Sequence, residues 1–363
     1  MLAASDITGN PSSVHAAGRA ARRCLEDARE TIAARFGAKA GDVVFTSGGT
    51  EADALAVHAF GLGRRVIIGA TEHDAIRAAA QGAAVLPVDR NGIADLDELR
   101  RSLGGGPPAL VCLMLANNET GVIQPLAEAA ALCRDHGALL HVDAVQAAGR
   151  LPVHLGTIGC HSLALSAHKM GGPAGVGALL LSPENAAMTP LIHGGGQERG
   201  RRGGTPALPA IAGFAAVCSA SIDLHRLASL RDRLEAAAVR HGAVICGGGA
   251  PRGGALRGGL PRLANTTSLA LAGVPASTQV IVLDLDGFAV SAGAACSSGK
   301  VQTSHVLSAM GLGALAGQAI RVSLPWNVTE NAVVEFEAAY ARMAERLSPP
   351  LLTAAPPHDR IWK

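Results

Sequence analysis

Short apolar runs alternate with amphipathic stretches through the first part of the chain. The apolar runs predict strands at residues 42–46, 65–69, 83–87, 109–115 and 138–143. Between them, apolar positions recur every three or four residues, which predicts helices at 16–36, 73–81, 96–103 and 125–136, with another after the glycine turn in 47–61. This regular order predicts an α/β fold with a mostly parallel sheet and helices on both faces.

The pattern changes in the second half of the chain. Two short strands in 163–181 flank a glycine turn, and a basic glycine-rich loop (193–209) leads into predicted helices at 210–219 and 224–240. The remaining expected strands are at 243–246, 265–270, 288–291 and 319–323, with a final helix at 329–347. We therefore predict a large domain over 1–228, a smaller α+β C-terminal domain over 229–347, and a tail over 348–363.

Composition narrows the classes of function. The formal net charge of the 363 residues is +2 and aromatic residues make up 2%, which disfavours direct binding of nucleic acid or of an anionic membrane. No apolar stretch is long enough to span a bilayer, and the N-terminus lacks the order of a signal peptide, so a cytoplasmic location is expected. The seven cysteines show neither zinc spacing nor a paired framework, so we expect no metal site.

Two charged residues stand at the ends of apolar runs. Asp143 ends the run 138–143, and Lys169 lies between the strand 163–166 and a glycine turn. A lysine that emerges from a buried strand end can lose its proton and form a Schiff base, as pyridoxal phosphate requires. A buried aspartate can keep the pyridine nitrogen of that cofactor protonated. The alternatives are a solvated surface lysine and an aspartate that only caps the following turn.

Two further segments carry candidate chemistry. Residues 46–51 (TSGGTE) join a strand to a helix, so their backbone N–H groups and hydroxyls can cradle a phosphate, or form only a capped glycine turn. Cys296 lies in a segment of small residues with Lys300 nearby, which favours a reactive thiolate. Cys24, Cys112, Cys133, Cys218 and Cys246 fall in helix or strand patterns typical of buried cysteines, and Cys160 is undecided.

Together these motifs resemble the cysteine desulfurases, homodimeric fold-type I enzymes of the class V aminotransferase group that use pyridoxal phosphate. The resemblance spans nearly the whole chain in the family's order. It rests on the segments GNPSSVH (9–15), FTSGGTEA (45–52), TEHDA (71–75), ANNETGVIQP (116–125), HVDAVQAAG (141–149), SAHKMGGPAGVGAL (166–179), HGGGQERGRRGGT (193–205), SAGAACSSG (291–299), SHVLSAMG (304–311) and IRVSL (320–324). It implies a fold-type I large domain with a seven-stranded sheet.

The resemblance also implies how the cofactor is held. Lys169 would form the Schiff base, Asp143 would pair with the pyridine nitrogen, and Gln146 would contact the phenolic oxygen. His73 would stack on the ring and act in catalysis. The cofactor-binding residues around the phosphate would be Gly49, Thr50, Ser166 and His168, with Thr205 contributed by the partner subunit of the homodimer.

Substrate binding and sulfur transfer follow from the same resemblance. Asn118 and Arg321 would bind the carboxylate of L-cysteine, and Cys296 would take the sulfur as a persulfide while L-alanine is released. The sulfur would then pass to an acceptor protein, such as an iron–sulfur scaffold, a tRNA-thiolating enzyme or another carrier.

The chain also departs from the family pattern. A further N-terminal segment is usual before GNPSS. Gly203, Pro206-Ala207 and His161 replace the usual serine, polar pair and aspartate. The competing interpretations are a weakly active or non-catalytic cofactor-binding scaffold that lacks the N-terminal segment, and another fold-type I enzyme such as an aminotransferase or a selenocysteine lyase.

Overall fold

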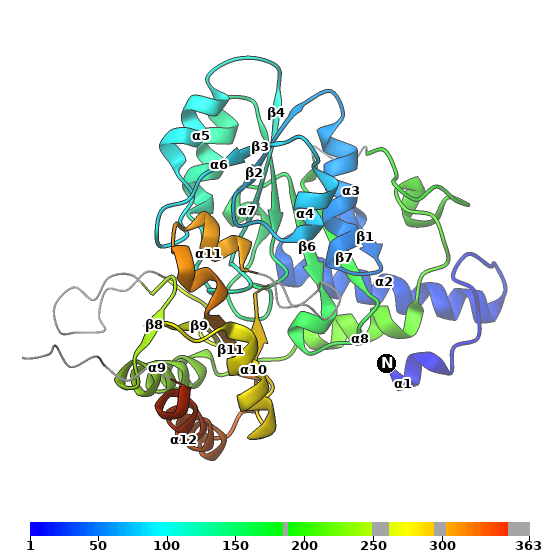
Figure 1. Ribbon diagram of the computed structural model, residues 1–363. Coiled ribbons are helices and arrows are strands. Elements are labelled where there is room, and N and C mark those ends of the chain that lie inside the picture. Colours follow the sequence, from blue (N-terminus) through cyan, green and yellow to red (C-terminus); the bar gives the residue numbers. More distant parts are fainter. Residues whose placement is uncertain (184–187, 249–260, 294–302, 348–363) are drawn as a thin grey trace, which may run out of the picture.

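The computed structural model describes residues 1–183, 188–248, 261–293 and 303–347. The larger sheet has seven strands in the order β1-β7-β6-β5-β4-β2-β3 (Figure 1). Neighbours from β6 to β3 pair in parallel, whereas β7 runs antiparallel to both β6 and β1. The mostly parallel seven-stranded sheet is therefore confirmed. The strands are β1 (Val43–Thr46), β2 (Arg65–Gly69), β3 (Ala84–Leu86), β4 (Ala109–Met114), β5 (Leu139–Asp143), β6 (Ser162–Ser166) and β7 (Gly177–Leu181).

Both faces of this sheet are covered by helices. Alternate residues of a strand point to opposite faces, so Val111 packs into one apolar cluster and Leu110 into another. The helices that contribute to the first cluster are α2 (Ala16–Phe36), α5 (Leu96–Leu103), α6 (Leu126–Asp135), α7 (Leu155–Ile158) and α8 (Leu208–Cys218). The second cluster receives α3 (Gly49–Gly61) and α4 (Asp74–Ala79). A short N-terminal helix, α1 (Leu2–Ser5), packs against α8.

Side-chain caps fix several helix starts close to the predicted positions. Asp95 accepts a hydrogen bond from the backbone N–H of Glu98 at 2.9 Å, so α5 begins at Leu96. Asp223 accepts from the N–H of Arg226 in the same way before α9 (Leu224–Arg240). An aspartate cap satisfies a backbone donor that would otherwise have no partner in the first turn. The expected bounds 96–103 and 224–240 are confirmed.

A second sheet lies below the first in Figure 1 and is antiparallel throughout, in the order β10-β11-β9-β8. Its strands are β8 (Ala243–Ile245), β9 (Thr266–Leu271), β10 (Ser291–Ala292) and β11 (Ala319–Ser323). One face packs against α9, α10 (Ala276–Leu285) and α12 (Glu330–Leu347). The other face packs against α11 (His305–Ala309). Leu227 of α9 already belongs to this second core, and the domain boundary at residue 228 stays a prediction.

The structure also differs from the expected pattern in the second half. Helices α10 and α11 have no counterpart among the predicted elements, and the strand expected at 288–291 is β10 at Ser291–Ala292. The α10 sequence is rich in β-branched residues and its apolar positions show little helical periodicity. Within the described ranges, no helix is both long and apolar enough to cross a bilayer.

Candidate active site

A cavity of about 230 Å³ lies where strands β4, β5 and β6 end. The last residue of each strand lines it: Met114, Asp143 and Ser166. Carboxyl ends of parallel strands are where ligands bind in sheets of this kind. The cavity brings together most of the residues singled out in the sequence, namely Gly49, Thr50, His73, Asn118, Asp143, Gln146, Ser166, His168, Lys169 and Arg321.

Lys169 is placed by the turn that follows β6. A short 3-10 helix (Ala167–Met170) ends at Gly171, whose φ of 89° is a left-handed conformation that favours glycine. The carbonyl of Lys169 accepts a hydrogen bond from Arg150 Nη2 at 2.7 Å, which fixes the backbone at this point. The side chain is half-buried and lines the cavity, so the surface-lysine alternative does not describe its setting.

Asp143 is a buried carboxylate in the same cavity. Its Oδ1 accepts from the backbone N–H of Val145 at 2.8 Å, so it also forms the capping turn that was the alternative to a functional role. Burial raises the pKa of the Asp143 carboxyl to about 7, and the Asp53 carboxyl nearby adds to the rise when it is ionised. A cation placed beside Asp143 would restore the ionised form.

His73 and Gln146 are the two residues expected to contact the cofactor ring. His73 Nδ1 accepts from the N–H of Ala75 at 3.1 Å, which makes it the N-cap of α4. Gln146 Oε1 accepts from Arg150 Nη1 at 3.0 Å. Both side chains line the cavity, and their ring contacts stay predictions.

Four of the five predicted phosphate ligands line the cavity: Gly49, Thr50, Ser166 and His168. Gly49 and Thr50 form the first turn of α3, whose N-terminus offers unpaired backbone N–H groups. Ser166 Oγ lies 2.9 Å from His168 Nδ1. Thr205 is exposed and is not among the residues that line the cavity, so within one chain it is separate from the other four.

The predicted substrate residues also meet. Arg321 on β11 donates through Nη1 to the carbonyl of Asn118 at 3.0 Å and through Nη2 to Ser291 Oγ at 3.1 Å. The Oδ1 atom of Asn118 is buried and has no hydrogen-bond partner among the described residues. A ligand with an N–H group would satisfy this acceptor, and the guanidinium suits a carboxylate.

Three buried residues of the cavity region were not singled out in the sequence: Asp53, Glu72 and His141. Asp53 lines the cavity and is 1% exposed. It follows Thr50 by three residues in α3, so both lie on one side of the helix. His141 precedes Asp143 by two residues in β5, so both side chains point to the same face of the sheet. The spacing of Asp53 from Thr50 and of His141 from Asp143 could therefore have identified these two residues.

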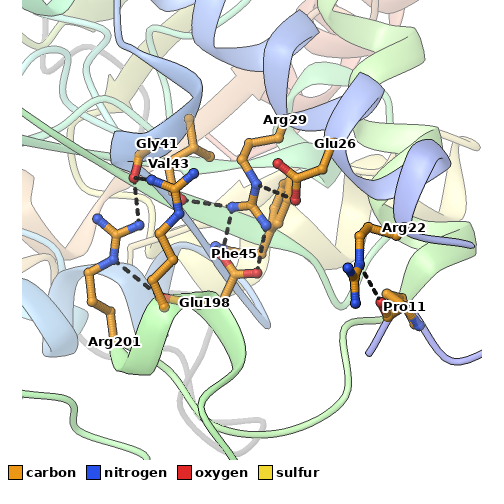
Figure 2. Close-up of polar contacts among 10 residues, drawn as sticks. Pro11, Arg22, Glu26, Arg29, Gly41, Val43, Phe45, Glu198 and Arg201 are labelled. Atoms are coloured by element: carbon orange, nitrogen blue, oxygen red, sulfur yellow. Dashed lines mark hydrogen bonds and ion pairs between the residues drawn. The ribbon is translucent and has the colours of Figure 1, made fainter. Parts of the chain in front are cut away.

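The glycine-rich loop is held against the large sheet by a buried ion pair (Figure 2). Arg29 of α2 donates to both carboxylate oxygens of Glu198, at 2.8 and 2.9 Å. Glu198 also accepts from the N–H of Phe45 at 2.9 Å. We refer to Arg29, Glu198 and Phe45 as the clamp. Glu198 has a φ of 50°, a conformation that is uncommon for a residue with a side chain and is maintained by these contacts.

A second ion pair connects the same loop to the N-terminus of α3. Arg202 donates through Nε and Nη2 to the two oxygens of Glu51, at 2.7 and 3.1 Å. Glu51 in turn accepts from the backbone N–H of Ser47 at 2.8 Å. The loop and the candidate phosphate cradle are therefore fixed to one another.

The described cysteines are free thiols. Cys112, Cys133, Cys160, Cys218 and Cys246 are buried and Cys24 is half-buried. Burial raises the pKa of Cys133, Cys160 and Cys218 to about 12 and that of Cys246 to about 11. Cys160, undecided from the sequence, therefore joins the buried group. Cys296 and Lys300 lie outside the described residues.

These residues fit pyridoxal phosphate. The cofactor has a phosphate, a cationic ring nitrogen and a carbonyl that reacts with an amine. The cavity offers an N-terminal helix turn at Gly49, a buried carboxylate at Asp143 and the amine of Lys169. Among the described residues, no group of three or more His, Cys, Asp and Glu side chains has the arrangement of a metal site.

Comparison with known proteins agrees with this chemistry. Residues 3–336 match the family model Aminotransferase class-V. The chain is 38% identical over 347 residues to an IscS-like cysteine desulfurase of Mycobacterium tuberculosis, covering 89% of this chain and 86% of the relative. It is 41% identical over 332 residues to a cysteine desulfurase of Cereibacter sphaeroides, covering 87% and 83%.

The solved structures agree as well. A NifS-like protein from Rickettsia africae superposes with a TM-score of 0.86 at 31% identity, covering 95% of this chain and 94% of the other. The fold, the family model and the relatives all lead to the same group. The chain belongs to the cysteine desulfurase family of the class V aminotransferases, whose enzymes depend on pyridoxal phosphate.

Proposed function

We propose that this cavity removes the sulfur atom from L-cysteine, releases L-alanine and places the sulfur on Cys296. The observation that carries the proposal is the convergence of Lys169, Asp143 and Arg321 on one cavity of about 230 Å³. An amine, a buried carboxylate and a guanidinium are the groups that an amino acid and pyridoxal phosphate need together.

Each residue has a defined task toward the cofactor in this proposal. Lys169 would hold it covalently, and Asp143 would keep a proton on its ring nitrogen. Gly49, Thr50, Ser166 and His168 would bind the phosphate, and Thr205 of a second copy would complete that site in a homodimer. When bound, the cofactor withdraws electrons from the α-carbon of the substrate.

The substrate would be oriented by its two charged groups. Arg321 already donates to the Asn118 carbonyl and to Ser291, so its guanidinium is positioned before a carboxylate arrives. Lys169 Nζ, once free, would remove the proton from the α-carbon. His73, at the N-terminus of α4, would stack on the ring and act in catalysis.

Sulfur transfer is assigned to Cys296. Its thiolate would attack the substrate sulfur, so that an S–S bond forms as the Cβ–S bond breaks. The electron pair of the broken bond stays with the three-carbon fragment, which becomes alanine after protonation. The persulfide sulfur would then pass to an acceptor protein in the cytoplasm, an iron–sulfur scaffold or a tRNA-thiolating enzyme.

The test is alanine formation from L-cysteine by the purified protein with added pyridoxal phosphate and a thiol reductant. Sustained alanine formation is expected. Cys296→Ser should lose the protein-bound persulfide yet keep the absorbance of the bound cofactor, and Cys160→Ser is the matched control because Cys160 is buried. A Cys296→Ser variant that makes alanine and sulfide at the parent rate would contradict the role of Cys296.

A further inference from the structure

Three buried carboxyl groups lie together at the cavity. Asp53 and Glu72 are each 1% exposed and Asp143 is 7% exposed. Glu72 accepts from the backbone N–H of Met114 at 2.8 Å, and Asp143 accepts from that of Val145. The second carboxyl oxygen of Glu72 has no hydrogen-bond partner within the described ranges. Three carboxylates cannot all stay ionised in so dry a place, because desolvation and mutual repulsion oppose it.

Asp53 differs from the other two because its hydrogen bond runs to an imidazole. Asp53 Oδ1 lies 3.1 Å from His141 Nε2, and His141 Nδ1 lies 2.8 Å from Ser162 Oγ. The side chain of His141 is 0% exposed and that of Asp53 is 2% exposed. We call this series of contacts, which joins α3, β5 and β6, the Asp53–His141–Ser162 chain.

While His141 Nδ1–H donates to Ser162, the proton between Asp53 and His141 Nε2 can lie on either partner. On Nε2 it leaves an ionised Asp53 beside a buried imidazolium, and on Asp53 it leaves a neutral acid beside a neutral imidazole. The first arrangement places two charges in a buried site next to Asp143 and Glu72, and the second places none. Burial raises the pKa of Asp53 and lowers that of His141 to about 4, and both shifts favour the uncharged arrangement.

We propose that Asp53 is a neutral carboxylic acid that donates its proton to His141 Nε2, and that the Asp53–His141–Ser162 chain thereby leaves Asp143 as the ionised carboxylate for the cofactor. Glu72, His73 and the thiol of Cys112 lie close to these groups, and the charged or titratable side chains of Asp74, His168, Lys169, His305 and Arg321 line the same cavity. Asp53 and His141 act through Asp143 and are positioning residues. The inference rests on Asp143 meeting the ring nitrogen, as in the proposed function.

The consequence is that Asp53 stays protonated and Asp143 can stay ionised. A hydrogen bond to the neutral form of an acid raises its pKa, so His141 keeps the proton on Asp53 rather than on Asp143. Without that acceptor the shared proton moves toward Asp143, and Asp143 pairs less well with a cation. The amide of asparagine at position 53 would remove the shared proton altogether while still offering an N–H donor to His141.

The first experiment measures protons directly and does not depend on catalysis. In protein with 15N-labelled histidine, His141 is expected as a neutral ring with the proton on Nδ1, both with and without pyridoxal phosphate. The infrared carbonyl band of a buried protonated acid should disappear in Asp53→Asn. Glu72→Gln is the control: the structure gives Glu72 no hydrogen bond to His141, so the band assigned to Asp53 should persist in this variant. A His141 ring that is protonated on Nε2, or on both nitrogens, would refute the proposal.

The second experiment separates charge from packing. His141→Leu is expected to weaken the affinity for pyridoxal phosphate about tenfold, which is the effect of losing one buried hydrogen bond. Asp53→Asn in the same protein should recover most of that affinity, because no proton is left to move to Asp143. Equal losses in the single and double variants would show that His141 only fills space, which would contradict the inference.

Alanine formation by the same samples keeps the two proposals distinct. A parent protein that makes no alanine but carries the proton on His141 Nδ1 would refute the desulfurase activity. The inference about the Asp53–His141–Ser162 chain would still stand. Should His141→Leu fail to fold, the 15N and infrared measurements on the parent and on Asp53→Asn still decide the inference.

Discussion

Two buried carboxylates in this molecule, Glu198 and Asp143, differ in the charge of the groups around them. Glu198 in the clamp receives two hydrogen bonds from Arg29 and one from the N–H of Phe45. Asp143, across the sheet, receives one from Val145 and lies near Asp53 and Glu72. The first carboxylate is bonded through both oxygens to one arginine, whereas the second lies near two other carboxyl groups and near His73 and His141.

The difference separates a structural charge from one that is kept for a ligand. A buried ion pair with complete hydrogen bonds holds two segments together, and breaking it is costly because a bare charge remains. A buried acid without a cationic neighbour is unstable in its ionised form, which raises its pKa. At Asp143 the ionised form is destabilised in the same way, and a cationic cofactor ring would offset this destabilisation.

The largest expected effect follows from removing the ligand-directed carboxylate. Asp143→Asn should lower the rate of alanine formation by about 100- to 1000-fold, the loss typical when a preorganised electrostatic partner is removed. The measurement is kcat for alanine together with the absorbance of the bound cofactor. An unchanged kcat would show that the ring nitrogen does not depend on Asp143.

Breaking the clamp should cost stability. Glu198→Ala leaves the buried Arg29 guanidinium with only the partly exposed Glu26 as an anionic partner and is expected to lower the free energy of unfolding by about 3–5 kcal/mol. Arg29→Met combined with Glu198→Leu should recover only part of this loss, because the N–H of Phe45 and the carbonyl of Val43 also lose their partners. Urea unfolding measures both. A double variant less stable than Glu198→Ala would contradict the bare-charge explanation.

The pH dependence of stability sharpens the comparison. The ordinary Asp143 pKa of 3.8 rises to about 7 in the folded protein, so the folded state binds more protons between these values. Its contribution to the free energy of unfolding therefore falls as pH rises from about 4 to 7. Asn has no such titration, so the Tm of cofactor-free Asp143→Asn minus that of the parent should rise over this window. A Tm difference that does not change with pH would contradict the raised pKa of Asp143.

His141 titrates in the opposite sense. Its pKa falls from 6.5 to about 4, so its contribution to stability grows as pH rises through this interval. Both proteins contain His141, so its contribution largely cancels in the difference between their Tm values.

The smallest effect is expected for an exposed pair. Arg101 Nη2 lies 2.9 Å from Glu98 Oε2 on the surface of α5, and its side chain is 64% exposed. Arg101→Gln should leave the free energy of unfolding almost unchanged, because solvent screens the pair. Urea unfolding beside the Glu198 variants provides the reference. A loss as large as that of Glu198→Ala would remove the distinction between buried and exposed pairs.

Much of the large sheet could be predicted because its strands are short, mostly apolar and regularly spaced. The same regularity placed Asp143 at the end of a strand and Lys169 in the turn after one, where the structure has them. Asp53 is harder to recognise from periodicity, because α3 is buried on most of its circumference; only its spacing from Thr50 indicates that it faces the cavity.

Helix α10 illustrates a second kind of limit. Its Gln279 is fully buried and donates through Nε2 to the carbonyls of Val274 and Gln318, at 3.0 and 2.7 Å. The bond to Gln318 joins residues 39 positions apart. Such a contact favours a helix over a strand for tertiary reasons that local residue preferences do not contain.

The strand order of the large sheet has a consequence for biosynthesis. The first strand, β1, has β7 as its sheet neighbour, with Val43 opposite Leu180. At a synthesis rate of about 5 to 20 residues per second, the ribosome needs roughly ten seconds to extend from one to the other. During that interval α2 and β1 have emerged without their partners, so the nascent chain must be shielded from aggregation until the segment that carries Lys169 has been made.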